Sequence, residues 1–572
     1  MSPFDLTTLF PILEKYRHSG RSALLQVLHE AQDLFTYLPE PVVSEIARSL
    51  DIPAVEVYGV IEFYALFYSQ PVGKTVIHVC NDPVCAMAGA DTLLKYTKQT
   101  ISLSLSAGRP FETITIERSP CLGLCEHAPT VLVRGVPVLS AGAGTIEELL
   151  TGTGRSPEPV IGGDVAVLTQ NCGCGETTWM EDYIQIGGYQ ALEKALKMQP
   201  AEIINAVKDS GLVGRGGAAF PTGVKWEATA RAVGACKYIV CNADEAEPGT
   251  FKDRVLMEDV PHRILEGMII GAYAIGASRG YIYIRGEYRN QYTVVEKAVQ
   301  QAYEAGYLGK NILGTGFSFE LELRRGAGAY VCGEETAQFE SIEGKRGFPR
   351  VKPPFPTTHG LFGQPTVINN VETFCNIPLI IRSSPQEFRK YGTEKSPGTK
   401  LFCLSGDVER PGLYEVPFGV SFRHLLEDLG GGVRAGNALQ AALFGGAAGA
   451  FATPAQLDVR LSFEDLRAAG LPLGAGAIII FDEHRDLRDV LLRLGHFFAD
   501  ESCGKCYPCQ IGTQRQLEIL QRVNDKNVLP GDLARLEDIA ATMTDASLCG
   551  LGQTASMAVM SAARNWPGLF SR

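Results

Sequence analysis

The sequence lacks the features that mark a membrane, secreted or nucleic-acid-binding protein. Its 572 residues contain no run of about 18 consecutive apolar residues, which a transmembrane helix would need. The start of the chain lacks a positive segment followed by an apolar stretch and a cleavage site, so we expect no secretion signal and a cytoplasmic location. The net charge is −12, with 52 Lys and Arg against 64 Asp and Glu, which argues against nucleic acid as the main partner.

Cysteine, by contrast, is abundant: the chain has 15. Thiols stay reduced in the cytosol, so we do not expect a disulfide framework, and an odd total leaves at least one cysteine unpaired. Either many of these thiols are buried as apolar side chains, or some of them bind metal. The nine histidines are scattered, and none has a convincing ligand spacing.

The first 150 residues predict a helical segment followed by a small α/β domain. Within the first 70 residues, Leu24, Leu25, Leu28 and Ala31 recur at helical spacing. Beyond them, β-branched runs alternate in the manner of strands around one helix-like segment. The predicted strands are 74–80, 113–117 and 130–139, and the predicted helix is 90–99.

The rest of the chain predicts a larger α/β unit and a helical end. Gly, Pro and Ser are concentrated at 151–164, which we interpret as a linker. Strand-like runs at 238–245 and 281–287 flank a buried helix at 266–276, an order typical of a mostly parallel sheet. A smaller α/β segment and a helical segment follow. The predicted divisions are 1–70, 71–150, the linker 151–164, 165–395, 396–482 and 483–572.

Two pairs of cysteines in the first α/β domain have the spacing of metal ligands. Cys80 and Cys85 follow one predicted strand, and Cys121 and Cys125 lie in a second turn-rich loop. Four thiolates on two loops can converge on one side of a small sheet, where such a set binds zinc or an iron–sulfur cluster. A Rieske centre would need two histidine ligands, and only His127 lies near either pair, apart from His78 two residues before Cys80. The alternative is two unrelated pairs of buried thiols.

Residues 1–150, with C-x₄-C and C-L-G-x-C at these positions, resemble the thioredoxin-like [2Fe–2S] subunit of respiratory complex I. The same module occurs in related NAD-linked hydrogenases and formate dehydrogenases. The resemblance implies that Cys80, Cys85, Cys121 and Cys125 hold a [2Fe–2S] cluster. It also implies an N-terminal helical bundle over 1–70, followed by a thioredoxin-like domain over 71–150.

A second set of cysteines lies near the end of the chain. Cys503, Cys506 and Cys509 form a C-x₂-C-x₂-C triplet ahead of a helix-like run, and Cys549 is the only cysteine downstream. The triplet resembles that of [4Fe–4S] proteins, in which closely spaced thiolates hold one face of the cluster. The alternative is a zinc site made of three cysteines and another ligand.

Between the two thiol sets lies a glycine-rich loop, GLVGRGGAAFPTGVKW (211–226). Glycines allow backbone N–H groups to approach a phosphate, and Arg215 and Lys225 supply positive charge nearby. No strong strand directly precedes this loop, so it departs from the dinucleotide-binding fingerprint. Taken alone, it is as compatible with a flexible loop as with a phosphate site.

Polar groups follow further predicted turns in the same region. Asn242, Asp244 and Glu245 end a predicted strand and can accept hydrogen bonds from ribityl, ribose or amide groups. A second glycine-rich turn precedes the neighbouring carboxylates Glu334 and Glu335. These two form either an acid/base pair or the acids that the helix dipole favours at a helix N-terminus.

This series of motifs, in this order over some 160 residues, resembles the NADH-binding flavoprotein subunit of complex I and its soluble relatives. The resemblance implies an FMN site made of Gly214, Gly216, Lys225, Asn242, Asp244, Glu245, Tyr330, Gly333, Glu334, Asn369, Asn370 and Thr373. It implies that NAD lies over the flavin among Phe220, Lys225, Glu247, Glu335, Lys352 and Phe355.

The family resemblance also implies further roles and domains. Glu247 and Glu335 are expected to orient the nicotinamide carboxamide and ribose, with no side chain acting as the primary acid or base. Cys503, Cys506, Cys509 and Cys549 are expected to hold a [4Fe–4S] cluster. The implied fold is a multidomain α/β and α+β chain, with a Rossmann-like FMN domain (165–395), a ubiquitin-like domain (396–482) and a C-terminal helical bundle (483–572).

Two positions depart from the family pattern, and seven cysteines stay without a role. Ala219 stands where the family usually has glycine, and Ala228 stands where many relatives have phenylalanine. The remaining thiols are expected to be buried, although Cys172 and Cys174, one residue apart, are also compatible with a redox or metal role. The seven are Cys172, Cys174, Cys236, Cys241, Cys332, Cys375 and Cys403.

The joining of the two modules in one chain resembles the β subunit of NAD-linked, metal-dependent formate dehydrogenases. That resemblance implies a large partner subunit that carries pterin-bound tungsten or molybdenum and further iron–sulfur clusters. The chain itself has no recognisable pterin segment and no nickel-type C-x-x-C pairs. Alternatives are the diaphorase of an NAD-reducing hydrogenase, a fused complex I input module, and a non-catalytic zinc-binding scaffold.

Overall fold

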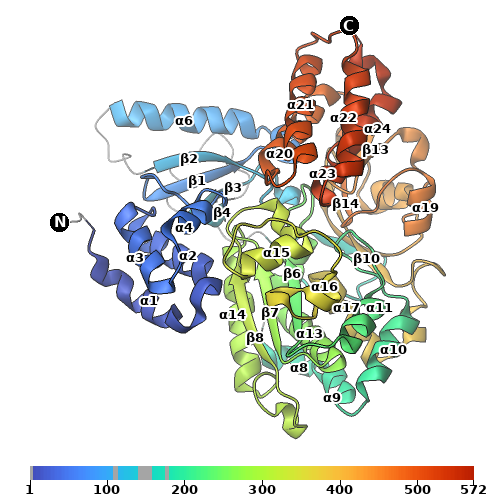
Figure 1. Ribbon diagram of the computed structural model, residues 1–572. Coiled ribbons are helices and arrows are strands. Elements are labelled where there is room, and N and C mark those ends of the chain that lie inside the picture. Colours follow the sequence, from blue (N-terminus) through green and yellow to red (C-terminus); the bar gives the residue numbers. More distant parts are fainter. Residues whose placement is uncertain (1–3, 107–113, 139–157, 174–178, 572) are drawn as a thin grey trace.

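The computed structural model describes residues 4–106, 114–138, 158–173 and 179–571. Figure 1 shows the N-terminal segments on one side of the molecule and the C-terminal helices at one end. The chain is a multidomain α/β and α+β protein, as predicted from the sequence. Within the described residues, no helix is both long enough and apolar enough to cross a membrane.

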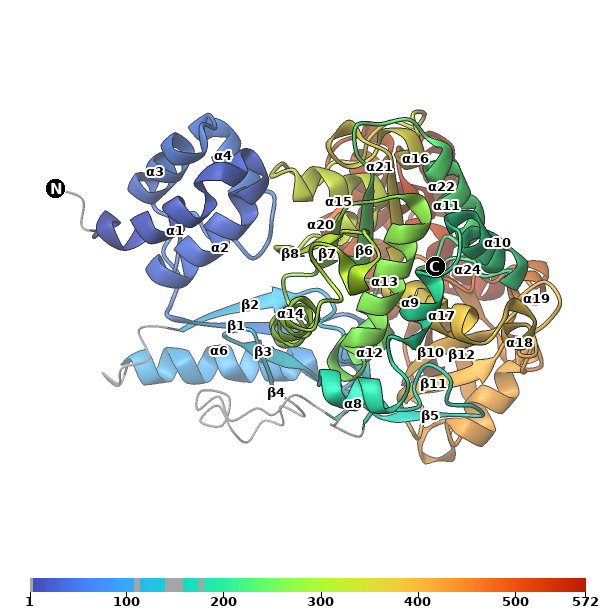
Figure 2. The ribbon, with the colours of Figure 1, turned by 90° about the horizontal axis from the view of Figure 1, so that it is seen from below.

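The N-terminal segment is a helical bundle that packs against the larger α/β domain (Figure 2). The predicted helical spacing is confirmed, because Leu24, Leu25 and Leu28 are buried on one face of their helix. Backbone N–H groups of Ala65 and Leu66 donate to the carbonyls of residues 328 and 327, so the bundle supports a turn of the larger domain. The helices are α1 (Phe10–Tyr16), α2 (Leu24–Phe35), α3 (Glu40–Leu50) and α4 (Ala54–Ile61), with 3₁₀ turns at Leu6–Leu9 and Arg17–Ala23.

The next domain is a four-stranded sheet in the order β2-β1-β3-β4. β1 pairs in parallel with β2 and antiparallel with β3. The single strand predicted at 130–139 is instead the hairpin β3–β4, because Arg134 and Gly135 turn the chain with φ of 52° and 78°. The elements are β1 (Thr75–Cys80), α5 (Pro83–Met87), α6 (Ala90–Ser106), β2 (Ile114–Ser119), β3 (Val131–Val133) and β4 (Val136–Val138).

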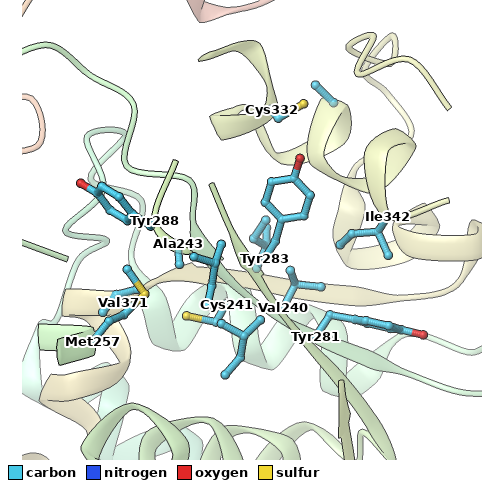
Figure 3. Close-up of a cluster of buried hydrophobic side chains, with 14 of the residues drawn as sticks. Val240, Cys241, Ala243, Met257, Tyr281, Tyr283, Tyr288, Cys332, Ile342 and Val371 are labelled. Carbon is cyan, nitrogen blue, oxygen red and sulfur yellow. The ribbon is translucent and has the colours of Figure 1, made fainter. Parts of the chain in front are cut away.

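The central domain is built on a fully parallel sheet in the order β8-β7-β6-β9. The predicted strand, buried helix and strand are confirmed as β6, α13 and β7. Helices α13 and α17 pack together beside β6, and α15 lies on the other side, where Ser341 hydrogen-bonds with Tyr283 Oη at 2.8 Å. Figure 3 shows Tyr283 reaching from the sheet toward Cys332. The strands are β6 (Tyr238–Ala243), β7 (Arg279–Ile284), β8 (Glu320–Arg325) and β9 (Thr366–Asn370).

Eleven described helices surround this sheet or connect its strands. The longest apolar one, α13, is buried over most of its length, as expected for a helix between a sheet and other helices. The helices are α8 (Met180–Gln185), α9 (Gln190–Ala195), α10 (Pro200–Ser210), α11 (Thr222–Arg231), α12 (Lys252–Asp259), α13 (Pro261–Ile275), α14 (Arg289–Glu304), α15 (Glu335–Ile342), α16 (Pro356–His359), α17 (Val371–Arg382) and α18 (Pro385–Phe388).

A second sheet has the mixed order β13-β12-β14-β10-β11-β5. Its outer strand β5 (Ile161–Gly163) pairs with β11, so the last part of the predicted linker 151–164 is a strand. The other elements are β10 (Thr399–Gly406), β11 (Gly412–Pro417), a π-helical turn (His424–Leu429), β12 (Leu439–Phe444), β13 (Ala450–Ala452), α19 (Phe463–Ala468) and β14 (Ala477–Asp482).

The C-terminal segment is helical, as predicted. It packs on the second sheet, since α24 contacts β13 and the Ser561 hydroxyl accepts from the Phe451 N–H at 2.9 Å. The helices are α20 (Leu487–Glu501), α21 (Tyr507–Asn524), α22 (Asp532–Ala546), α23 (Gly550–Thr554) and α24 (Met557–Asn565).

Candidate functional site

A cavity of about 700 Å³ lies at the carboxyl end of the parallel sheet. The chain runs from β6 outward to β7 and β8 and then returns to place β9 on the opposite side of β6. Ligands of open α/β sheets bind in the crevice outside such a reversal of strand order. The cavity lies there, because Asp244 and Glu245 follow β6, Asn370 ends β9, and all three line it.

Nine residues that the sequence resemblance proposed for FMN or NAD line this cavity. They share no single element and come from four separate segments of the chain. They are Gly216, Asn242, Asp244, Glu245, Glu247, Tyr330, Gly333, Glu334 and Asn370.

The glycine-rich loop connects α10 to α11, so no strand precedes it, as the sequence indicated. A Cβ atom on Gly216 would lie 2.9 Å from Asn370 Cβ, and Gly217 has a φ of 122°. Both positions therefore need glycine for the backbone to reach the cavity. Ala219 has a φ of 52°, the left-handed region, which explains why glycine suits this position in the family.

The polar floor of the cavity contains one unsatisfied carboxylate. Asn242 donates to the Gly333 carbonyl at 2.9 Å and accepts from Gln338 at 3.0 Å, so its amide is fixed. The buried Oδ2 atom of Asp244 has no hydrogen-bond partner. Burial raises the pKa of Asp244 well above its usual value. An orphaned acceptor and a glycine-lined backbone suit a ligand that brings its own hydroxyl or N–H donors and a phosphate.

Glu247 is another carboxylate of the cavity, and both of its oxygens accept a hydrogen bond. Its carboxylate accepts from Tyr330 Oη at 2.5 Å and from the Ala448 N–H at 3.0 Å. Burial raises the pKa of Glu247 to about 7, although these donors oppose the shift. Gly446 packs directly on this side chain, because a Cβ there would lie 2.5 Å from Glu247 Oε1.

Charged side chains gather at the rim beside Glu334. Glu334 caps α15 by accepting from the N–H groups of Thr336 and Ala337, so the helix N-terminal interpretation is confirmed for it. Lys352 Nζ donates to Glu334 at 2.8 Å and to Glu335 at 2.7 Å, and Lys225 Nζ lies 3.8 Å from Glu335. Burial lowers the pKa of Lys225.

One exposed aromatic side chain lies at this rim. Phe220 is 50% exposed and lies under Lys225, whose Nζ is 5.8 Å from the ring centre. Phe355, three residues after Lys352 in the chain, is 56% exposed. Exposed aromatic rings beside cations suit a planar, anionic ligand.

Three proposed FMN residues lie behind the cavity rather than on its surface. Asn369 is buried and accepts from Trp226 Nε1 at 2.9 Å. Thr373 is fully buried and accepts from the Arg215 N–H at 2.9 Å, and the Gly214 N–H donates to the Phe220 carbonyl at 2.9 Å. Their observed contacts hold the glycine-rich loop and α11 in place.

Sequence reasoning missed the far side of the cavity. Two segments of the second sheet's domain and one segment of the C-terminal helices complete it. The sequence feature that could have indicated this side is its two glycine-rich turns, FGGAAGA (444–450) and GLPLGAG (470–476). Neither turn carries a charged side chain. The additional lining residues are Gly445, Ala448, Phe463, Arg467, Gly470, Leu471, Pro472, Leu473, Gly474, Ala475, Gly550, Leu551, Thr554 and Met557.

The first thiol set converges at the end of β1. Cys121 Sγ and Cys125 Sγ are 3.3 Å apart, and the neighbouring thiols of Cys121 and Cys85 raise the pKa of the Cys80 thiol. All four side chains are at most 4% exposed. Four buried thiols from two short segments of the chain suit a soft metal centre such as an iron–sulfur cluster.

The second thiol set converges beside the cavity. Cys503, Cys506, Cys509 and Cys549 together line one small pocket. Cys506 and Cys549 are the N-cap residues of α21 and α23.

This second pocket adjoins the large cavity, because Leu551 lines both. A hydrogen bond makes a second connection: the N–H of the cavity residue Tyr330 donates to Glu501 at 2.9 Å, two residues before Cys503.

The other described cysteines lie outside these two sets. Cys172, Cys241, Cys332, Cys375 and Cys403 are buried, as expected, and Cys236 is half-buried. Cys174 lies outside the described residues. Among the described residues, no three His, Cys, Asp or Glu side chains already have the geometry of a single metal-ion site.

Three family models match this chain, each over one of its parts. Residues 9–153 match the thioredoxin-like [2Fe-2S] ferredoxin model, and residues 207–379 match the Nuo51 FMN-binding domain. Residues 489–572 match the NADH-ubiquinone oxidoreductase-F iron-sulfur binding region.

Relatives and a solved structure agree with these matches. A second F-type subunit of the NADH-quinone oxidoreductase of Rhizobium meliloti is 45% identical over 71% of this chain and 96% of the relative. The NADP-reducing hydrogenase subunit HndC of Solidesulfovibrio fructosivorans is 46% identical over 69% of this chain and 80% of the relative. A chain of an NAD+-reducing [NiFe]-hydrogenase superposes with a TM-score of 0.83 at 33% identity, covering 97% of this chain and 94% of that one.

Fold, cavity and matches together define an oxidoreductase subunit that takes electrons from NADH through FMN and iron–sulfur clusters. The chain belongs to the family of F-type subunits of NADH-quinone oxidoreductase, with a thioredoxin-like [2Fe–2S] module fused in front. Its cofactors are FMN, NAD, one [2Fe–2S] cluster and one [4Fe–4S] cluster.

Proposed function

We propose that this chain is the NAD(H)-oxidising and NAD(H)-reducing diaphorase of a multisubunit complex located in the cytoplasm. The observation that carries the proposal is the position of one cavity next to the second thiol set and one bridging residue away from the first. Leu551 separates the cavity from the second set. On the other side, Arg285 bonds both the Glu245 carbonyl, beside the cavity, and the carbonyl of Cys121 in the first set.

FMN, when bound, exchanges a hydride with a nicotinamide and single electrons with iron–sulfur clusters. We assign Gly216 and Asn370 to the part of the FMN site that is lined by backbone. We assign Asp244 and Glu245 to the hydroxyl or amide groups of FMN. Asn242, Tyr330, Gly333 and Glu334 complete this site, while Gly214, Asn369 and Thr373 hold its loop. Both thiol sets are the proposed cluster ligands, Cys80, Cys85, Cys121 and Cys125 for [2Fe–2S], and Cys503, Cys506, Cys509 and Cys549 for [4Fe–4S].

NAD is proposed to bind over this site from the rim. Phe220 and Phe355 are exposed, and Lys225 and Lys352 offer positive charge to its phosphates. Glu247 and Glu335 are proposed to orient the carboxamide and ribose by hydrogen bonding. The chain's task is thus positional, and no side chain has to carry the transferred hydride.

The Lys225→Ala variant tests this assignment. The purified chain is expected to reduce an artificial electron acceptor with NADH, and loss of Lys225 is expected to lower kcat/KM at least tenfold. Cys172→Ser, a change in a buried thiol outside the cavity lining, serves as the control and is expected to change it less than twofold. Equal activity of the two variants would contradict the assignment.

The proposed partner is a large formate-oxidising subunit that carries pterin-bound tungsten or molybdenum and further iron–sulfur clusters. Support comes from the sequence resemblance to the β subunit of NAD-linked formate dehydrogenases, in which both modules share one chain. The assembled complex would interconvert formate and carbon dioxide while reducing or oxidising NAD.

A hydrogenase partner is the second candidate. The solved chain of an NAD+-reducing [NiFe]-hydrogenase matches 97% of this chain, including both modules. Metal analysis of the co-purified large subunit separates the candidates. Tungsten or molybdenum supports formate oxidation, nickel supports hydrogenase, and neither metal would contradict both.

The zinc-binding scaffold considered from the sequence is not supported, because the family models match an FMN-binding domain and two iron–sulfur regions. It predicts a colourless protein that contains zinc and no flavin, whereas the diaphorase predicts a yellow-brown protein whose acid extract contains FMN. Absorbance and an acid extract of the purified chain decide between them.

A further inference from the structure

We propose that Arg285 is a positioning residue that holds the Cys121–Cys125 loop against the flavin cavity and raises the reduction potential of the [2Fe–2S] cluster. The proposal rests on the function proposed above, in which Cys121 and Cys125 are ligands of that cluster. Its basis is a buried guanidinium that joins the two sites.

Arg285 directly follows β7, at the carboxyl edge of the parallel sheet, and is 2% exposed. Its Nη2 donates to the carbonyl of Cys121 at 2.7 Å, and its Nη1 donates to the carbonyl of Glu245 at 2.6 Å. One rigid, planar group therefore fixes the distance between a cluster ligand and a cavity residue. The five N–H donors of an arginine make this possible, and a lysine would offer only a point charge.

A second set of contacts closes the same junction. Tyr288 Oη donates to the Glu245 carboxylate at 3.1 Å, and the Arg285 guanidinium lies 5.1 Å from the Tyr288 ring centre. Gly123 packs on this tyrosine, since a Cβ there would lie 1.9 Å from Tyr288 Oη. The ligand loop is thus held at Cys121 by the arginine and at Gly123 by the tyrosine.

The opposite charges of Arg285 and Glu287 act on the reduction potential of the [2Fe–2S] cluster in opposite directions. Nη2 and Nε of Arg285 donate to Glu287 at 2.9 and 3.1 Å, but only the arginine bonds the ligand loop. The two side chains form a buried salt bridge, with Arg285 Nη2 2.9 Å from Glu287 Oε1. Reduction adds one negative charge to the cluster, so a buried cation on the ligand carbonyl stabilises the reduced form, and hydrogen bonding and nearby charge are known to tune such potentials.

The test is an EPR-monitored redox titration of the full chain, with the [4Fe–4S] signal as internal reference. Arg285→Gln is expected to weaken one-electron reduction of the [2Fe–2S] cluster about tenfold, a fall of about 59 mV in its midpoint potential. Glu287→Gln, which leaves the cation unopposed, is expected to shift the potential in the opposite direction. Arg285→Lys and the double variant Arg285→Gln/Glu287→Gln are expected to lie closer to the unmodified protein.

The inference would be overturned if the midpoint potential shifted in the same direction in Arg285→Gln and Glu287→Gln, or in neither variant. A merely structural role of Arg285 gives no reason for the two potentials to shift in opposite directions. If Arg285→Gln does not fold, Glu287→Gln and Arg285→Lys still test the inference. A raised potential in Glu287→Gln, with Arg285→Lys near the unmodified value, supports the inference. An unchanged potential in Glu287→Gln overturns it. Absence of any [2Fe–2S] signal in the unmodified protein would instead overturn the proposed function.

Discussion

At the scale of residues, the cavity combines side chains whose hydrogen bonds are complete with one whose bonds are not. Asn242 and Glu247 are fixed by neighbouring donors and acceptors, whereas Asp244 Oδ2 is buried without a partner. A buried acceptor without a partner costs free energy, roughly 1–3 kcal/mol, unless a ligand satisfies it. We therefore expect bound flavin to stabilise the chain through Asp244.

Glu247→Gln is expected to change how stability depends on pH. Burial raises the pKa of Glu247 to about 7 from its ordinary value of 4.5. Between these two pH values the folded state binds the proton more tightly than the unfolded state does. The protein therefore loses folding stability as the pH rises through this range. The glutamine variant does not ionise, and it should gain up to about 3 kcal/mol relative to the unmodified protein between about pH 5 and pH 8.

The measurement is the difference in Tm between variant and unmodified protein at those two pH values. Glu394→Gln, a change in an exposed carboxylate, serves as the control for the loss of one negative charge. A constant difference for Glu247→Gln would contradict the argument.

Ala219→Gly is expected to stabilise the glycine-rich loop. Ala219 adopts a φ of 52°, which costs a residue with a Cβ atom about 1 kcal/mol more than glycine. We expect a gain of about that size in the free energy of unfolding, partly offset by the greater freedom of glycine in the unfolded chain. Chemical denaturation checks it, and a loss of stability would show that the loop is not strained at this position.

The sequence pointed to nine of the residues that line the cavity, but not to which of two neighbours faces the ligand. Asn369 and Asn370 stand side by side in one motif and were both expected to bind FMN. Successive side chains of a strand point to opposite faces, so Asn370 reaches the cavity while Asn369 bonds Trp226. Without the register of β9, the sequence contains nothing that distinguishes them.

At the scale of elements, a buried carboxylate anchors the chain where the second module begins. Glu415 on β11 accepts from the backbone N–H groups of Val167, Leu168 and Thr169, and from the hydroxyls of Thr169 and Thr399. Strand β5 pairs with the same strand just before these residues. The segment after the linker is therefore part of the second sheet's domain.

Glu415→Gln is expected to loosen this anchor. The NH₂ of the new amide group would face backbone N–H donors and could not accept their hydrogen bonds. We therefore expect the free energy of unfolding to fall by about 3 kcal/mol, the order found when a buried charged acceptor loses its bonds. Hydrogen exchange of residues 161–169 should rise together with the loss of thermal stability. Glu427→Gln on the same domain, where the carboxylate is 45% exposed, is the control and should change neither.

Elements with strong periodicity were predictable, and short or uncharged ones were not. The helices α20, α21 and α22 and the strands β6 and β7 follow from apolar spacing. β5 has only three residues, Ile161, Gly162 and Gly163, and its glycines suggested a linker. The far side of the cavity was missed for a related reason, since its turns contain glycine, alanine and leucine rather than groups with recognisable chemistry.

At the scale of the whole molecule, three sites meet around one short segment, 244–254. Several of its residues line the cavity, and its Arg254 donates to the Gly123 carbonyl at 2.8 Å and pairs with Glu126 of the first thiol loop. Tyr330, on the other side of the cavity, is bonded to Glu501 near the second thiol set. The fused chain thereby fixes both thiol sets relative to the cavity without a separate subunit interface.

The most direct test of the account is anaerobic addition of NADH to the purified full chain, with FMN and iron measured beforehand. We predict one FMN and about six iron atoms per chain, the sum of one [2Fe–2S] and one [4Fe–4S] cluster. We also predict that NADH bleaches the flavin absorbance and produces a reduced iron–sulfur signal by EPR. A chain that contains zinc in place of iron, or a flavin that NADH does not bleach, would contradict the account.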